Sequence, residues 1–307
     1  MSRLRASVER AIRGKTEVVD LALTALFARG HVLLEDVPGV GKTTLARALA
    51  KSIGCTFHRI QFTSDMLPSD VLGVSVYDRE RGRFEFKPGP IFANVVLADE
   101  INRAPPKTQS CLLEAMNEGQ VSIEAETHTL SDPFVVLATQ NPQEFWGTYP
   151  LPESQLDRFL LRIRIGYPAP EVERQIVTDL ADRDPVDALR PVVSAEDVRG
   201  VQSAVEQVRF EPPLLDYLMA IVEETRKSPL IETGVSTRGA MALHRAARAW
   251  AVVHGRDFCL PDDVQALAVS ALAHRIVASG GREASAVDRH AAERALAEIV
   301  DRVAVPL

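Results

Sequence analysis

Long apolar runs are missing from this chain of 307 residues. No stretch approaches the roughly 18 uncharged apolar residues that span a membrane. No apolar segment follows residues 1–5, so we expect no secretory signal. The three cysteines and seven histidines show no metal-ligand spacing. Such cysteines usually pack as small buried apolar residues in proteins of a reducing compartment. We therefore expect a cytoplasmic protein.

A basic excess is missing as well. Lysine and arginine number 35 against 42 aspartates and glutamates, a formal net charge of −7. A dedicated nucleic-acid binder usually carries excess positive charge, so a nucleic-acid partner is not expected. The 46% hydrophobic and 25% charged residues are those of an ordinary globular protein. The length suggests two domains, or one core with a large appendage.

Five short apolar runs indicate the strands of one sheet: residues 31–34, 57–62, 95–98, 134–138 and 160–165. The third and fourth runs lack polar alternation, which is typical of parallel strands buried on both faces. Helical patterns such as Leu45, Leu49 and Ile53 lie between the runs. This order predicts an α/β domain over residues 1–166, with a five-stranded parallel sheet.

The pattern changes after residue 166. Apolar residues now recur at helical spacing, as in Leu214, Leu218 and Ile221. No convincing strand follows. We therefore predict that residues 167–307 form a smaller all-α domain.

A phosphate-binding motif follows the first run. Glycines let the backbone curl so that N–H groups point at phosphate oxygens, and the next helix adds the partial positive charge of its N-terminus. Lys42 is placed to reach the β- and γ-phosphates, and the Thr43 hydroxyl to bind Mg²⁺. The predicted nucleotide-binding residues are Asp36, Val37, Pro38, Gly39, Val40, Gly41, Lys42, Thr43 and Thr44.

Two features complicate this motif. Asp36 stands where the strict phosphate-loop pattern has its first glycine. A Gly-Lys-Thr triplet also occurs at residues 14–16, where it matches the pattern equally well. No apolar strand precedes that triplet, whereas residues 36–43 have a strand before them and a helix after them. The phosphate loop is therefore predicted at residues 36–43.

Polar side chains end the next two buried runs. Asp99 follows residues 95–98 and is placed to hold Mg²⁺ through water, while Glu100 is placed to polarise the attacking water. The alternative is that both acids cap the following helix. Asn141 ends the fourth run, where it can bind the γ-phosphate or the attacking water. The alternative there is an ordinary Asn-Pro turn.

Two inserts extend the α/β pattern. The 32 residues between the second and third runs exceed what a crossover helix requires. Alternating arms at residues 74–77 and 83–86 indicate a hairpin, and residues 120–130 indicate a second one. A passive surface hairpin is the alternative in each case.

Together these motifs resemble AAA+ ATPases. More narrowly, four segments resemble the MoxR family: residues 33–43, 67–70, 99–104 and 151–159. The resemblance runs from about residue 14 to the end, and it accounts for Asp36, because the family often has an acid there. It implies that the inserts are the helix-2 insert and the pre-sensor-1 hairpin, which face the pore or one rim of a ring. It also implies that the segment around residues 14–16 packs near the adenine.

The resemblance implies roles for single residues. Lys42 and Thr43 resemble the Walker A pair, Asp99 and Glu100 resemble Walker B, and Asn141 resembles sensor 1.

Two arginines complete this set. Arg158 resembles the arginine finger that projects into the neighbouring subunit's site, and Arg238 resembles sensor 2 on the helical lid. A guanidinium suits both roles because it presents planar donors to phosphate and keeps its charge. The alternative for each is a salt bridge to a nearby acid.

The resemblance also implies a function. It implies ATP and Mg²⁺ as cofactors and a homo-oligomeric ring, which we expect to be hexameric. MoxR proteins commonly act as chaperone-like remodellers of protein complexes or cofactor-containing enzymes. The expected partners are therefore a protein client and a protein with a von Willebrand factor type A domain.

Two other functions stay open on the sequence. The acidic balance, with Glu124 and Glu126 in the second hairpin, disfavours a DNA-engaged AAA+ motor or loader. Glu100, Asn141 and Arg158 together disfavour a P-loop small-molecule kinase, because a kinase must exclude water.

Overall fold

A five-stranded parallel sheet forms the centre of the protein, as predicted. The computed structural model describes residues 1–123, 126–141, 147–179, 184–279 and 286–306. Each strand overlaps the apolar run that predicted it, with ends that differ by at most two residues. In spatial order the strands are β2 (Phe57–Gln61), β5 (Val95–Asp99), β8 (Val135–Gln140), β1 (Val32–Glu35) and β9 (Leu161–Ile163).

Buried apolar residues cover both faces of this sheet. Leu34 and Leu97 belong to one hydrophobic cluster, and their strand neighbours Leu33 and Val96 belong to another. Neighbouring residues of a strand point to opposite faces. A strand with both faces buried therefore shows no polar alternation, as the sequence of β5 and β8 indicated.

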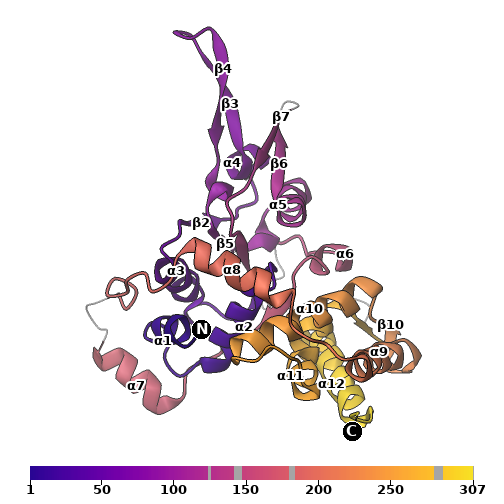
Figure 1. Cartoon of the computed structure of the whole chain (residues 1–307). Coiled ribbons are helices and arrows are strands. Elements are labelled where there is room, and N and C mark those ends of the chain that lie inside the picture. The colour runs from indigo at the N-terminus through magenta and orange to yellow at the C-terminus, as the bar shows by residue number, and fades with distance from the viewer. Residues whose placement is uncertain (124–125, 142–146, 180–183, 280–285, 307) are drawn as a thin grey trace.

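Helices make up most of the remaining structure (Figure 1). Those that precede β9 along the chain are α1 (Ser2–Glu9), α2 (Thr16–Phe27), α3 (Lys42–Ile53), α4 (Pro68–Leu72), α5 (Pro106–Glu118) and α6 (Glu153–Leu156). Those that follow the sheet are α7 (Pro170–Asp179), α8 (Ala195–Val205), α9 (Pro212–Lys227), α10 (Thr237–Val253), α11 (Pro261–Leu272) and α12 (Ala286–Arg302). In the part of the chain that the structure describes, no helix is long and apolar enough to cross a membrane.

The prediction of no strand after residue 166 is wrong. β10 (Ile231–Thr233) pairs with β11 (Val277–Ala278) as a small antiparallel sheet. Strands of three and two residues are too short to show a period of two. Only their tertiary contact reveals them.

The helical part packs closely onto the sheet. Helix α2 lies against α8 and α10 as well as against α1 and β9, and 10 of its 12 residues are buried. One buried cluster contains both Leu34 of β1 and Leu243 of α10. The core is therefore continuous across residue 166, and the domain boundary there stays a prediction.

Both predicted inserts are antiparallel hairpins, and they project from the same end of the molecule (Figure 1). The strands are β3 (Gly73–Asp78) with β4 (Arg83–Pro88), and β6 (Gln120–Ile123) with β7 (Glu126–Thr129). The rings of Phe86 and His128 stack with their centroids 4.0 Å apart and connect the two hairpins. Residues 124–125 of the second predicted turn lie outside the described residues.

Candidate functional site

The connection between β1 and α3 has the conformation of a phosphate loop. Gly39 and Gly41 have φ angles of 86° and 99°, a left-handed conformation that residues with a Cβ atom disfavour. A Cβ atom at Gly39 would meet no other atom within 4 Å, so the space beside the loop is open. Helix α3 begins at Lys42, directly after the loop. Its free N–H groups and the loop amides form a surface suited to anions.

The predicted phosphate-binding groups are accessible. Residues 37–44 are all half-buried or exposed, so a ligand can reach them. The Lys42 Nζ donates a hydrogen bond to the main-chain oxygen of Asp36 at 2.8 Å. The ammonium group therefore lies over the loop whose phosphate it is predicted to bind.

Asp36, the departure from the strict pattern, fastens the loop to the rest of the chain. Its buried carboxylate accepts a hydrogen bond from Val37 N at 2.9 Å and another from Gly166 N at 2.6 Å. A glycine at this position has no side chain to make these bonds. Nearby, Lys15 Nζ donates to Tyr167 O at 2.7 Å. The second Gly-Lys-Thr triplet thus packs beside this connection, at the start of α2.

Glu35 forms a second link from the end of β1. Arg162 of β9 lies with its Nη1 3.5 Å from Glu35 Oε2 and its Nη2 2.5 Å from Glu293 Oε1 of α12. The side chains of Glu35 and Arg162 are only 3% and 4% exposed. The charges therefore connect the last helix to the strand that leads into the phosphate loop. Nothing in the sequence indicated this network.

Asp99 is the last residue of β5. This strand pairs with β8, which in turn pairs with β1, the strand that leads into the phosphate loop. Its Oδ1 accepts a hydrogen bond from Thr139 Oγ1 at 2.5 Å. Its Oδ2 accepts two from Arg59, from Nε at 3.0 Å and Nη2 at 2.6 Å. These donors hold the carboxylate in place. Sequence analysis missed both Thr139 and Arg59, although Thr139 lies two residues before the predicted Asn141.

Glu100 adopts an unusual backbone conformation. Its φ of 58° is left-handed, which is uncommon for a residue other than glycine and tends to occur at functional sites. Glu100 N donates to Thr139 Oγ1 at 2.8 Å. The same hydroxyl therefore contacts the main chain of Glu100 and the carboxylate of Asp99. Glu100 Oε2 accepts from Gln61 Nε2 at 2.7 Å and lies 3.1 Å from Arg103 Nε. Its carboxylate is thus oriented by the end of β2.

Asn141 directly follows β8, and it is half-buried. The phosphate loop, Asp99 and Asn141 therefore lie at the carboxyl ends of β1, β5 and β8, which are adjacent parallel strands. Ligands of open parallel sheets bind at this carboxyl edge. Pro142, the other half of the predicted Asn-Pro turn, lies outside the described residues.

The donor set at this edge suits a metal-bound polyphosphate. The loop offers amides and an ammonium group, and Thr43 and Asp99 offer the oxygen ligands that Mg²⁺ prefers. Glu100 offers a carboxylate beside them. The arrangement can thus bind phosphate and activate water.

Comparisons with known proteins agree with this geometry. Residues 31–161 match the model of the ATPase family associated with various cellular activities (AAA), and residues 223–299 match the AAA lid domain. The chain is 50% identical over 300 residues to the uncharacterized protein YeaC of Bacillus subtilis (strain 168), covering 98% of this chain and 93% of YeaC. It is 42% identical over 279 residues to Chaperone MoxR1 of Mycobacterium tuberculosis, covering 88% of this chain and 74% of that one.

The chain belongs to the MoxR family of AAA+ ATPases. A solved structure agrees: a candidate ATPase from Cytophaga hutchinsonii matches with a TM-score of 0.89 at 37% identity. That match covers 100% of this chain and 94% of the other. The resemblance to MoxR proteins and the α/β fold with a helical lid are thus confirmed.

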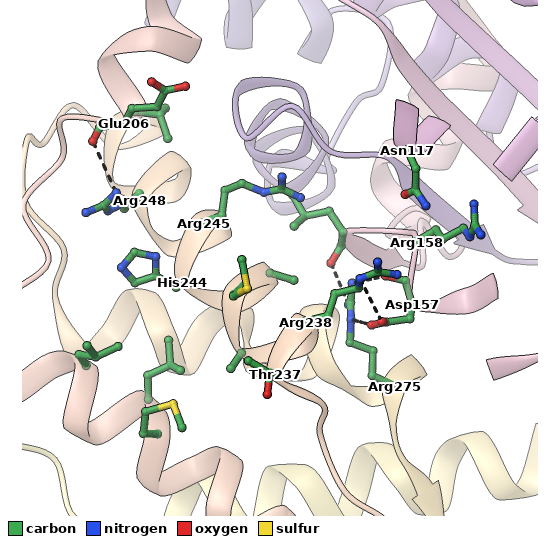
Figure 2. A pocket seen from close by; sticks show the side chains of 18 of the residues that line it. Asn117, Asp157, Arg158, Glu206, Thr237, Arg238, His244, Arg245, Arg248 and Arg275 are labelled. Atoms are coloured by element: carbon green, nitrogen blue, oxygen red, sulfur yellow. Dashed lines mark hydrogen bonds and ion pairs between the residues drawn. The ribbon is translucent and has the colours of Figure 1, made fainter. Parts of the chain in front are cut away.

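The two arginines expected in a MoxR protein both line a cavity of about 890 Å³, which residues of α5, α8, α9 and α10 also line (Figure 2). Arg158 Nη1 donates to Leu113 O at 2.7 Å, and its buried Nε has no hydrogen-bond partner in the described chain. Arg238 Nε lies 3.8 Å from Asp157 Oδ2, with the side chain 63% exposed. Such an exposed pair contributes little. None of residues 36–44 lines this cavity.

Arg275 occupies the inner wall of the cavity and is absent from the sequence prediction. Its Nε donates to Asp157 Oδ1 at 2.7 Å, and its Nη2 donates to Phe159 O at 2.6 Å. Burial lowers the pKa of Arg275 to about 10, although Asp157 acts to raise it. Arg275 thus holds the segment that carries Arg158. No sequence motif surrounds it.

Proposed function

We propose that this MoxR-family protein is an ATP-hydrolysing, ring-forming chaperone that remodels protein complexes or cofactor-containing enzymes. The observation that carries the proposal is the separation of its charges. The phosphate loop and the acids Asp99 and Glu100 share the carboxyl edge of the sheet, whereas Arg158 and Arg238 line a cavity to which the loop contributes no residue. A site that needs both sets is completed by a second copy.

The chain's own residues divide the work at the sheet edge. Loop amides and Lys42 bind and orient the triphosphate, and Thr43 with Asp99 would hold Mg²⁺. The metal would supply neutralisation of phosphate charge. Glu100 accepts the proton of the attacking water, and Asn141 orients that water or the γ-phosphate.

Gln61 and Arg103 bear on the same step. Both contact Glu100 Oε2 in the structure. These two contacts fix the direction in which the carboxylate points. We propose that these contacts loosen when Glu100 takes up its proton.

Arg158, as the arginine finger, supplies positive charge to the nucleotide of the neighbouring subunit. Arg238, as sensor 2, faces the same cavity. The proposed assembly is a hexameric ring, with the two hairpins at its pore or rim. The client is a protein, and a second partner carries a von Willebrand factor type A domain. The name of its relative, Chaperone MoxR1, supports the chaperone role.

Subunit mixing tests this proposal. Lys42→Ala should lose ATP binding, and Arg158→Ala should bind ATP but hydrolyse it about 10³–10⁵-fold more slowly. A mixture of the two should regain activity, because one variant supplies a sound loop and the other a sound finger. Parent activity per subunit should also rise with protein concentration.

Two results would contradict the proposal. If Arg158→Ala hydrolyses ATP at the parent rate, Arg158 is not an arginine finger. If the monomer is fully active, hydrolysis does not require a ring. Phosphate release that requires a small-molecule acceptor would favour the kinase alternative.

A further inference from the structure

Arg245 brings a charge into the cavity that no described residue compensates. It lies on α10, two helical turns after Arg238 and on the same face. Its side chain extends into the cavity toward Asp157 and Arg275 (Figure 2). Within the described ranges it makes no hydrogen bond and no ion pair. The side chain is exposed, and the protein around it lowers the pKa of its guanidinium by partial desolvation.

The acids that line the cavity do not balance its arginines. Asp157 is paired with Arg275 and approached by Arg238. The lining contains six arginines against three acids, the others being Glu118 and Glu206. Burial lowers the pKa of Arg275 most, Asp157 acts to raise it, and Arg245 and Arg238 each lower it further, so each of these two lies close enough to Arg275 to repel it.

This arrangement calls for an anion from outside the chain. Arginine keeps its charge at any physiological pH, so the repulsion is not relieved by loss of a proton. Partly desolvated like charges are unfavourable unless a counter-charge joins them. Guanidinium N–H groups match phosphate oxygens in pairs, and several of them at one place match a polyphosphate better than a single carboxylate. A cavity of about 890 Å³ is in the usual range for small-molecule sites.

We propose that this cavity binds the phosphate groups of a nucleotide and that Arg245 is a third phosphate-binding arginine, beside Arg158 and Arg238. The inference rests on the proposed function, because it assigns those phosphates to the ATP held by the phosphate loop of a second copy. The loop of the same chain contributes no lining residue. A free polyphosphate has the same chemistry, and the experiment separates the two sources.

The experiment uses the full-length protein and three variants. Arg245→Gln removes the charge with little change of size, and Arg245→Lys keeps the charge but loses the paired donors. Arg209→Gln is the matched control, since Arg209 is 63% exposed and does not line the cavity. Arg245→Gln should lower kcat/KM for ATP by about 10- to 100-fold. Arg245→Lys should fall between, and the control should match the parent.

Mixing identifies the source of the phosphate. Arg245→Gln mixed with Lys42→Ala should exceed the activity of either alone, because a mixed interface joins a sound loop to a sound cavity. Parental activity of Arg245→Gln would overturn the proposal, and no gain on mixing would overturn the neighbour as the source of the phosphates.

A direct titration separates this proposal from the ATPase itself. Calorimetry with tripolyphosphate on Lys42→Ala, with and without Arg245→Gln, tests the cavity alone. Binding that depends on Arg245 supports the phosphate site even if the parent lacks ATPase activity, which would contradict only the proposed function. Such binding without any gain on mixing would make a free polyphosphate the ligand and overturn the neighbour as its source. Binding that does not depend on Arg245 would remove this arginine from the site.

Discussion

The phosphate-loop edge and the arginine cavity treat charge in opposite ways. At the edge, each acid meets donors of its own chain: Asp36 meets two main-chain amides, Asp99 meets Thr139 and Arg59, and Glu100 meets Gln61. In the cavity, Arg158 reaches only a main-chain oxygen. The edge is internally balanced before any ligand binds, whereas the cavity holds surplus positive charge.

This difference indicates which ligand each region suits. The edge has ordered carboxylates and an open loop, so it is ready for a metal-bound polyphosphate. The cavity has more arginines than acids, so it suits the negative charge of a ligand. On the proposed function, these two halves complete each other between copies of the chain. Three variants or conditions can break this comparison.

The largest of these three effects is expected at Glu100. Glu100→Gln keeps the shape of the side chain but cannot accept a proton, so hydrolysis should fall about 10²–10⁴-fold while ATP binding persists. Single-turnover hydrolysis and equilibrium ATP binding would measure the two separately. Glu80→Gln, on an exposed hairpin turn, is the matched control. Hydrolysis at the parent rate would show that the edge is not the catalytic half.

An acid titration should destabilise the fold through His31, a buried residue that directly precedes β1. His31 is fully buried, and Val136 N donates to its Nδ1 at 3.0 Å, so the ring is neutral and its Nε2–H donates to Met116 O at 2.9 Å. Burial lowers the pKa of His31 to about 4 from 6.5. The unfolded chain therefore binds the proton first as the pH falls.

Stability is full above pH 6.5 and should drop by about 3 kcal/mol as the pH falls from 6.5 to 4. Burial also lowers the pKa of His274, which acts in the same direction. Urea unfolding at several pH values would measure the free energy of unfolding. His31→Leu should flatten the curve between pH 6.5 and 4. An unchanged pH dependence in that variant would exclude His31 as its source.

The smallest effect is expected at Asp36. Asp36→Asn can accept only one of the two hydrogen bonds and turns an NH₂ group toward the other amide. The free energy of unfolding should fall by about 1–3 kcal/mol. Asp301→Asn, an exposed residue of α12, is the control. An equal Tm for Asp36→Asn and the parent would show that the link to Gly166 contributes nothing.

The sheet was largely predictable because its signals are local. Five apolar runs located β1, β2, β5, β8 and β9 to within two residues. The helical spacing of Leu214, Leu218 and Ile221 predicted α9. β10 and β11 escaped because two- and three-residue strands have no measurable period.

The site was predictable in part for the same reason. Residues 36–44, Asp99 and Asn141 lie at strand ends, and parallel strands bring their carboxyl ends to one edge. Thr139, Arg59 and Gln61 were missed, because their importance comes from a neighbouring strand and not from any motif.

The sequence by itself determined the strands, the phosphate loop and the acids, since each depends on residues a few positions apart. Only the tertiary structure decided that Asp36 fastens the loop to Gly166 and that Arg162 connects Glu35 with α12. It also decided that Arg158 and Arg245 share one cavity. These contacts join segments more than a hundred residues apart or faces of different elements. Periodicity and spacing carry no information at that range, because the packing of the whole core sets the partner of each charge.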